Sequence, residues 1–382
     1  RRVHGGNTVL SAGESMGLPE NPNPTRPPEL LLISALLALE PTGYLISLAK
    51  QSGGGIISEG IQKLLWGYCN SILSPFELRN SLFLRKFTKS LIQEVESSGA
   101  VVLDEIYELC NNLMAAPLVT ETHFDSFYDL SNLGCNFQAC SANKSDRVLK
   151  RFSFLFPDTV NCDSSLQIPL LCSTNMLEGD TGCSIWPASL YLSEFIFSFP
   201  NIFENKQCFE IGSGTGLVGI CLSHVRASKI ILSDGDVSSL QNLKQNLELN
   251  RVNLHESFTN CEVIHLPWES ASKNFIGKCS PDIILGADVI YDPACLPDLV
   301  RVIAWLLGTD SPECSSEKKR MPVAYVAAVV RNEETFDYFL KLSNEGNLSV
   351  ADVTANFKVS TFLPYLQSYV RETVRLLEIK NI

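Results

Sequence analysis

The chain has 382 residues, 45% of them hydrophobic and 19% charged, which is typical of a soluble globular protein with about two domains and excludes a disordered one. Acidic residues outnumber basic ones by 42 to 30, giving a formal charge of −12. This balance disfavours non-specific nucleic-acid binding, which needs a basic field, and suits a basic protein or peptide partner. We expect a monomer that binds neither nucleic acid nor a membrane.

Cysteine usage and the N-terminal region indicate the compartment. The 13 cysteines are odd in number, scattered and without a C-x-x-C pair, so they predict neither a disulfide framework nor a metal site. The apolar run PELLLISALLALEPTGYLISLAK is interrupted by Glu40 and Pro41, so it cannot cross a bilayer as one helix. The two leading arginines precede no apolar segment and make no secretory signal. We therefore predict a cytoplasmic protein.

The first half of the chain divides into three predicted parts. Residues 1–28 are rich in Gly, Pro and Asn and are predicted to be disordered. Residues 29–117 are predicted to form a helical accessory domain without a catalytic motif, because apolar residues recur at helical spacing in stretches such as NSLFLRKFTKSLIQEVESSG. That stretch places Leu82, Phe83, Phe87, Leu91, Ile92 and Val95 on the predicted apolar face, and Gly99 ends it. Residues 118–160 have no clean period and are predicted to be a connector or insertion.

From residue 161 to 382 strands and helices are predicted to alternate. The stretch SLQIPLLCST indicates a strand or hairpin, and Pro187 suits the first turn of the helix that follows. Next come strand CFEI, helix GLVGICLSHV, strand KIILSD, helix VSSLQNLKQNLELN and strand CEVIHL, and then PDIILGAD and PVAYVAAVV as strands with helices after each. This order predicts an α/β, Rossmann-like, doubly wound sheet with helices on both faces.

A glycine-rich turn, CFEIGSGTGLVGI, follows the first strand of this sheet. Ligands of such folds bind at the carboxyl ends of the strands, and Gly212 and Gly214 permit close backbone approach there. The residues Gly214, Gly216 and Gly219 also match the G-x-G-x-x-G pattern of a dinucleotide site. That fingerprint starts directly after the strand, where Gly212 stands, so the register disfavours it.

The next predicted strand ends in KIILSDGD, with an acid about twenty residues beyond the turn. Asp234 is the first choice for binding ribose hydroxyls, whereas Asp236 is better placed to cap the following helix. The turn and this acid together predict a nucleoside-binding domain. They leave a dinucleotide and S-adenosylmethionine as alternatives.

Three further features favour S-adenosylmethionine. Trp268 follows the third strand, on the same edge as Asp234, where an aromatic ring can stack on an adenine. The fourth strand ends in PDIILGADVIYDP, which contains Asp288-x-x-Tyr291. The C-terminal order of strand, helix, strand and strand permits an antiparallel closing hairpin.

With these features in place, the domain resembles the seven-stranded S-adenosylmethionine-dependent methyltransferases, and among them the eukaryotic lysine methyltransferases with an acid-x-x-Tyr motif. The resemblance rests on WPASLYLSEF, EIGSGTGLVGI, PDIILGADVIYDP, VAAVVRNEETF and FLPY, and it extends to FLRKFTKSLI and LDEIYELCNNLMA in the helical region. It is strongest toward the group that methylates elongation factor 2. It implies S-adenosyl-L-methionine as cofactor and elongation factor 2 as protein substrate.

The resemblance also implies the site residues. Those that would line the cofactor are Trp186, Gly212, Ser213, Gly214, Asp234, Trp268 and Ala287. Asp288 and Tyr291 would face the target lysine, and no metal is expected. Three alternatives stay open: methylation of another protein or a small amine, a methyltransferase-like binding module without activity, and, more distantly, a nicotinamide oxidoreductase.

Overall fold

The computed structural model describes residues 26–72, 80–115, 147–157, 165–173, 181–251, 260–308 and 321–382. Most of the segment predicted to be disordered, residues 1–25, lies outside the described residues, as do 118–146 and 158–160 of the predicted connector. In the part of the chain that the structure describes, no helix is long and apolar enough to cross a membrane.

The accessory region is helical, as predicted. It consists of α1 (Pro28–Leu37), α2 (Thr42–Ser52), α3 (Glu59–Ile72), α4 (Ser81–Ser97) and α5 (Asp104–Ala115). Helix α4 buries Leu84, Phe87, Leu91 and Val95, which follow one another at three- and four-residue spacing. Leu82, which was expected on this face, is 63% exposed.

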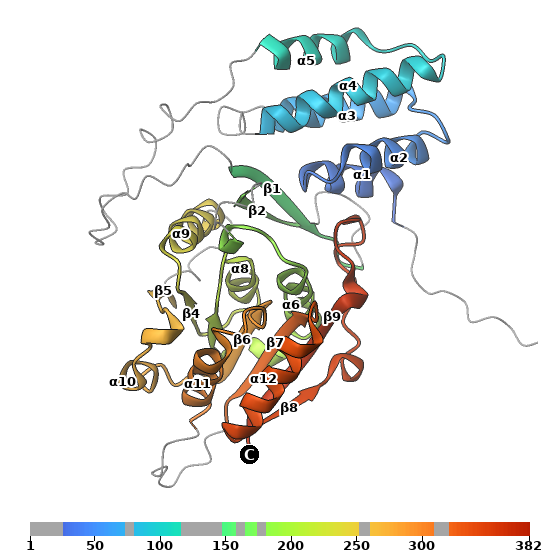
Figure 1. Ribbon diagram of the computed structural model, residues 1–382. Helices are drawn as coiled ribbons and strands as arrows, with labels where there is room; N and C mark the ends of the chain where they lie inside the picture. Colours follow the sequence, from blue (N-terminus) through green and yellow to red (C-terminus); the bar gives the residue numbers. More distant parts are fainter. Residues whose placement is uncertain are drawn as a thin grey trace, which may run out of the picture.

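An antiparallel hairpin lies between the accessory helices and the main domain (Figure 1). It pairs β1 (Arg147–Phe154) with β2 (Leu166–Ser173), so the predicted strand SLQIPLLCST is present and its partner lies within the stretch expected to be a connector. The side-chain amide of Asn246 both accepts from Leu171 N at 2.7 Å and donates to Leu171 O at 3.1 Å. These bonds join the hairpin to α9 (Val237–Arg251).

The main domain contains a seven-stranded sheet in the order β5-β4-β3-β6-β7-β9-β8. Its strands are β3 (Gln207–Ile211), β4 (Lys229–Asp234), β5 (Cys261–His265), β6 (Ile283–Ala287), β7 (Val323–Val329), β8 (Leu348–Asp352) and β9 (Val374–Asn381). The first five strands along this order are parallel, and β9 pairs antiparallel with both β7 and β8. The α/β sheet with a closing antiparallel hairpin is therefore confirmed.

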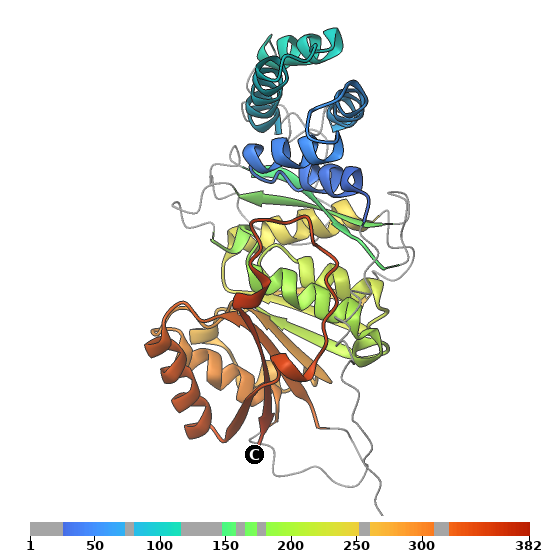
Figure 2. The ribbon, with the colours of Figure 1, turned by 90° about the vertical axis from the view of Figure 1, so that its right-hand side faces the viewer.

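Helices cover both faces of this sheet (Figure 2). One face carries α6 (Pro187–Ser198), α7 (Pro200–Phe203), α8 (Leu217–His224) and α9. The other carries α10 (Lys273–Ile276), α11 (Leu296–Leu306) and α12 (Glu333–Glu345). Pro187 is the first residue of α6, as predicted, where its missing N–H leaves no hydrogen bond unmade.

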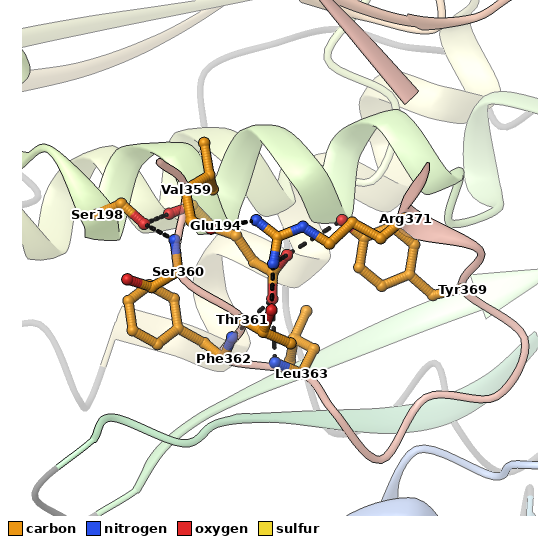
Figure 3. Close-up of polar contacts among 9 residues, drawn as sticks. All are labelled: Glu194, Ser198, Val359, Ser360, Thr361, Phe362, Leu363, Tyr369 and Arg371. Atoms are coloured by element: carbon orange, nitrogen blue, oxygen red, sulfur yellow. Dashed lines mark hydrogen bonds and ion pairs between the residues drawn. The ribbon is translucent and has the colours of Figure 1, made fainter. Parts of the chain in front are cut away.

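A segment between β8 and β9, residues 353–373, runs from the sheet to the accessory helices, and we call it the strap. The strap leaves β8 after Asp352, which pairs with Leu377 of β9. It enters β9 at Val374, which pairs with Val329, the last residue of β7. Both ends of the strap therefore lie at the edge of the sheet where β7 ends. Buried Glu194 of α6 fastens it (Figure 3).

The Glu194 carboxylate gathers donors from three parts of the strap (Figure 3). It accepts from the backbone N–H of Phe362 at 2.7 Å and of Leu363 at 3.1 Å, and from the Tyr369 hydroxyl at 3.1 Å. Arg371 lies 3.6 Å from the same carboxylate and donates to Val359 O at 2.6 Å. Burial raises the pKa of Glu194, and Arg371 and the hydrogen-bond donors oppose that change.

The strap also contacts the hairpin and the accessory region. The Glu40 carboxylate, at the turn between α1 and α2, accepts from Ser368 N at 3.0 Å and from its hydroxyl at 2.6 Å. Leu155, directly after β1, donates its N–H to Phe362 O at 2.9 Å. The strap is therefore a polar link among the three parts of the fold.

Candidate active site

The predicted site residues come from the carboxyl ends of neighbouring strands. Strands β4 and β5 follow β3 on one side and β6 and β7 lie on its other side, so the strand order reverses beside β3 and makes this edge a topological switch point. Gly212 follows β3, Asp234 ends β4 and Asp288 follows β6. Three stretches far apart in the sequence thus meet at one edge.

The glycine turn is tightly packed. Gly212 and Gly214 have φ values of +66° and +50°, which L side chains rarely adopt. A Cβ on Gly212 would lie 2.9 Å from Val289 Cγ1 and 3.7 Å from Trp268 Cζ2. A Cβ on Gly214 would lie 2.8 Å from the carbonyl oxygen of Gly182. The turn therefore has backbone and Trp268 as close neighbours, with no space for a side chain.

Ser213 continues the hydrogen bonding between β3 and β4 beyond the ends of the strands. Its N–H donates to Ser233 O at 2.8 Å, and its hydroxyl accepts from Ser233 N at 3.1 Å. The residue is buried, so its side chain points into the sheet and its backbone fixes the shape of the turn.

Asp234 is attached to the glycine turn and keeps acceptor capacity. Its Oδ2 accepts from Gly214 N at 2.9 Å and its Oδ1 from Asp236 N at 3.0 Å. The backbone N–H of Gly235 also interacts with this carboxylate, so three of its roughly four lone-pair positions are engaged and about one is left. Burial raises the pKa of the Asp234 carboxyl above its usual value. Asp236 instead accepts from Ser239 N at 2.6 Å at the start of α9, the capping role expected for it.

Trp268 lies in the loop after β5, beside Asp234. Leu266 N donates to Asp234 O at 2.9 Å, which brings this loop to the end of β4. Arg301 of α11 donates to Trp268 O at 3.0 Å and holds the loop from the other side. The ring is neither buried nor fully exposed. The side chain packs against the hydrophobic core on this side of the sheet, with Cζ2 as its atom nearest Gly212.

Asp288 is held in place by Arg331. The Arg331 guanidinium donates from Nη1 to Oδ1 and from Nη2 to Oδ2 of Asp288, both at 3.1 Å, and Val329 N donates to Oδ1 at 3.0 Å. The Asp288 side chain is 5% exposed and that of Arg331 is 44% exposed. The Arg331 Cζ also lies 5.2 Å from the centroid of the Trp186 ring, and Trp186 Nε1 donates to Thr181 O at 3.0 Å.

Tyr291 and Ala287 complete the predicted set. Ala287 is the last residue of β6 and is partly buried, and Tyr291 is 62% exposed. The carboxylates of Asp234 and Asp292 interact electrostatically with the Tyr291 hydroxyl. The phenol is thus the accessible group of the Asp-x-x-Tyr motif.

Sequence reasoning assigned no role to two residues at this edge, Arg331 and Gly182. Arg331 stands just after β7, and the rule that ligands bind at strand carboxyl ends applies to this strand as it does to β6. Gly182 carries no such signal, because its approach to Gly214 is visible only in three dimensions. Among the described residues, no three His, Cys, Asp or Glu side chains gather as metal ligands.

Comparisons with known proteins identify the family. A lysine methyltransferase family profile matches residues 165–344. The protein-lysine N-methyltransferase EEF2KMT of Bos taurus is 30% identical over 67% of this chain and 69% of its own length. The chain belongs to the lysine methyltransferase family. Its cofactor is accordingly S-adenosylmethionine.

Two other relatives show how far this likeness extends. An uncharacterized protein of Dictyostelium discoideum is 35% identical over 47% of this chain, and the match spans 54% of that protein. The protein-lysine N-methyltransferase EFM3 of Saccharomyces cerevisiae is 27% identical over 56% of this chain and 63% of its own length.

The residues at the sheet edge fit this family's cofactor. Asp234 keeps acceptor capacity for a ribose hydroxyl, and the partly exposed Trp268 side chain lies near Gly212, where an adenine would stack on it. The glycine turn excludes side chains where the backbone must approach a ligand closely.

Proposed function

We propose that this lysine methyltransferase transfers methyl groups from S-adenosylmethionine to a lysine of elongation factor 2 in the cytoplasm. One observation carries the proposal: the glycine turn and Asp234 lie at the same sheet edge as Asp288 and Tyr291. A cofactor bound at this edge would therefore adjoin an accessible tyrosine. The relatives named protein-lysine N-methyltransferase support a protein substrate.

In this proposal the cofactor lies along the ends of β3, β4 and β6. Asp234 would accept from the ribose, Trp268 would stack on the adenine, and the backbone of Gly212, Ser213 and Gly214 would lie against the ligand. Trp186 and Ala287 would border the methyl-donor end.

The chemistry needs alignment more than covalent catalysis. When bound, S-adenosylmethionine supplies a methyl group on a sulfonium: the amine lone pair forms the N–C bond as the C–S bond breaks with its electrons left on sulfur. A fixed approach of this kind supplies several kcal/mol of barrier lowering, roughly 7–11 in well-oriented reactions. Asp288 orients the lysine amine, and Tyr291 shapes its channel and hydrogen-bonds near the amine. The lysine must first release its proton, because an ammonium has no lone pair.

The charge of the protein fits a basic segment around the target lysine. The formal charge is −12, and Asp234 and Asp292 lie within electrostatic reach of Tyr291. These carboxylates attract a cationic side chain to the mouth of the site. The accessory helices supply a further surface on the same chain, which a folded substrate can use and a small amine cannot.

Transfer of a labelled methyl group into purified elongation factor 2 tests the proposal. Wild type should label one lysine, found by mass spectrometry, whereas Asp288→Ala should lose turnover and still bind the cofactor. Asp337→Ala, an exposed acid of α12, is the matched control and should keep full activity. Label in another protein or in a small amine would show that the substrate is that molecule and not elongation factor 2. Cofactor binding without any transfer would show that the chain is a binding module.

A further inference from the structure

A single guanidinium connects the two halves of the candidate active site. Arg331 donates two hydrogen bonds to the carboxylate of Asp288, and its Cζ lies over the ring of Trp186. Trp186 precedes the first residue of α6, Asp288 follows β6 and Arg331 follows β7. Fixing one side chain therefore fixes the geometry of three elements at the sheet edge.

The backbone around this contact is also held. Asp288 has φ +54°, a left-handed conformation that Asp tolerates better than most residues, and its N–H donates to Ala327 O at 2.9 Å. On the other side, Asn332 accepts from Glu334 N at 2.9 Å and from Thr335 N at 3.2 Å, capping α12 directly after Arg331. Both partners of the ion pair thus extend from constrained backbone.

The hydrogen bonds of Asp288 leave little acceptor capacity. Its Oδ1 accepts two hydrogen bonds, from Val329 N and Arg331 Nη1, and its Oδ2 accepts one, from Arg331 Nη2. Of about four lone-pair positions on a carboxylate, one on Oδ2 receives no bond from the residues that the structure describes. That position can accept from one N–H of an incoming amine.

Charge decides what kind of amine this position favours. An isolated carboxylate beside a lysine stabilises the ammonium, which cannot react, whereas a nearby cation opposes it. We propose that Arg331 is a positioning residue that neutralises Asp288, so that the pair orients the neutral amine of the target lysine without stabilising its ammonium. The inference rests on the proposed lysine methylation. The released proton passes to solvent before the methyl group is transferred.

Other titratable groups lie near Tyr291 or shortly after Arg331, and they stay constant in the test. Asp234, Asp292 and Cys295 interact electrostatically with Tyr291 on the motif that follows β6. Glu333 and Glu334 lie exposed in the first turn of α12, next to Arg331. The carboxylates among them favour a cationic lysine, and the neutralisation of Asp288 by Arg331 opposes that effect.

The test is the pH dependence of kcat toward elongation factor 2. Arg331→Gln leaves Asp288 unneutralised, so the acid-side apparent pKa should rise by about one unit or more, with roughly tenfold loss below it and recovery at higher pH. Asp288→Asn should lower the acid-side apparent pKa and should also lower the maximal kcat. The double variant should return it to within about half a unit of wild type, because neither charge is present.

A control and a second readout separate positioning from general damage. Arg375→Gln is the matched control, because Arg375 lies at the same sheet edge beside an aromatic ring, Phe336, and should keep the wild-type profile. Without cofactor or substrate, the urea midpoints of the Arg331 and Asp288 variants should be non-additive, the double variant matching the worse single one.

Each outcome decides the inference. If the wild type is active and the acid-side limb of the pH profile of kcat does not move in Arg331→Gln, the role of the pair is overturned and the proposed function stands. Fully additive urea midpoints have the same consequence. A wild type that methylates no lysine overturns the proposed function and the inference together.

Discussion

Gly214 meets two conditions at once, a φ of +50° and a backbone oxygen 2.8 Å from where a Cβ would stand. Both conditions belong to the turn that carries the candidate cofactor site. The clash is with a carbonyl and not with a movable side chain end, so the backbone itself must shift to relieve it.

Gly214→Ala should therefore lower the free energy of unfolding by about 2 kcal/mol or more, from the left-handed conformation and the displaced backbone. Cofactor binding should fall with it. The matched control is Gly43→Ala, in α2, where a Cβ meets nothing within 4 Å, and it should raise stability by about 0.5–1 kcal/mol. Urea unfolding measures both, and equal effects in the two variants would contradict the role of the turn.

Glu210, at the end of β3, is a second residue whose environment has a measurable consequence. It is fully buried, and its Oε2 has no hydrogen-bond partner among the described residues. Burial raises its pKa well above the usual value of 4.5, so the folded state holds this proton more tightly than the unfolded chain does. Its contribution to stability is present below pH 4.5 and is lost as pH rises toward the folded pKa.

Glutamine does not ionise, so Glu210→Gln does not lose stability at this position as pH rises. The variant should gain on wild type as pH rises from 5 to 8, by up to about 1.4 kcal/mol per pH unit while the carboxyl is protonated in the folded protein and ionised in the unfolded chain. Unfolding free energies from urea titrations at several pH values provide the comparison. A difference between the two proteins that is constant across this range would show that Glu210 has an ordinary pKa.

At this scale the sequence was informative where chemistry follows a strand end. The glycine turn, Asp234 and the Asp-x-x-Tyr motif all lie at the predicted edge. The pairing of Asp288 with Arg331 escaped prediction because 43 residues separate them and only the adjacency of β6 and β7 brings them together.

Among the elements, the strap depends most on one buried contact. The carboxylate of Glu194 is 0% exposed and holds two backbone N–H groups, a hydroxyl and Arg371. Removing it leaves these donors and a mostly buried guanidinium without their acceptor, a change that is strongly destabilising in buried pairs.

Glu194→Ala should lower the free energy of unfolding by about 3–5 kcal/mol. Glu345→Ala is the matched control, because its pair with Lys341, at 3.9 Å, is exposed, and its effect should stay within about 0.5 kcal/mol. Thermal and urea unfolding of the two variants supply the numbers. A loss as small as that of the control would mean that the strap is held by its apolar contacts alone.

The elements were predicted unevenly. The alternating strands and helices after residue 161 have clear apolar periods, and the structure confirms them. Strand β1 was missed, because Lys150 and Arg151 interrupt its apolar pattern and Arg147 is buried against Asn242, to which it donates at 3.0 Å. A charged residue that finds its partner on another element looks like a surface residue in the sequence.

For the whole molecule, one hydrophobic core runs from the accessory helices through the hairpin to one face of the sheet. Leu36, Phe154 and Leu232 belong to it, one from each part. The polar bonds of the strap join distant residues, and the bond of Ser368 with Glu40 spans 328 positions. Sequence patterns predict each part but not this arrangement, because contacts of such separation leave no local period. The predicted boundaries at 29, 118 and 161 stay predictions.

We propose that the edge formed by β3, β4 and β6 binds S-adenosylmethionine. Calorimetric titration of the cofactor into wild type and Asp234→Asn tests it most directly. Wild type should bind one equivalent, and the variant, which loses charge-assisted acceptors, should bind at least tenfold more weakly. Asp337→Asn should bind as wild type does. No binding to wild type, or equal affinity in Asp234→Asn, would contradict the claim.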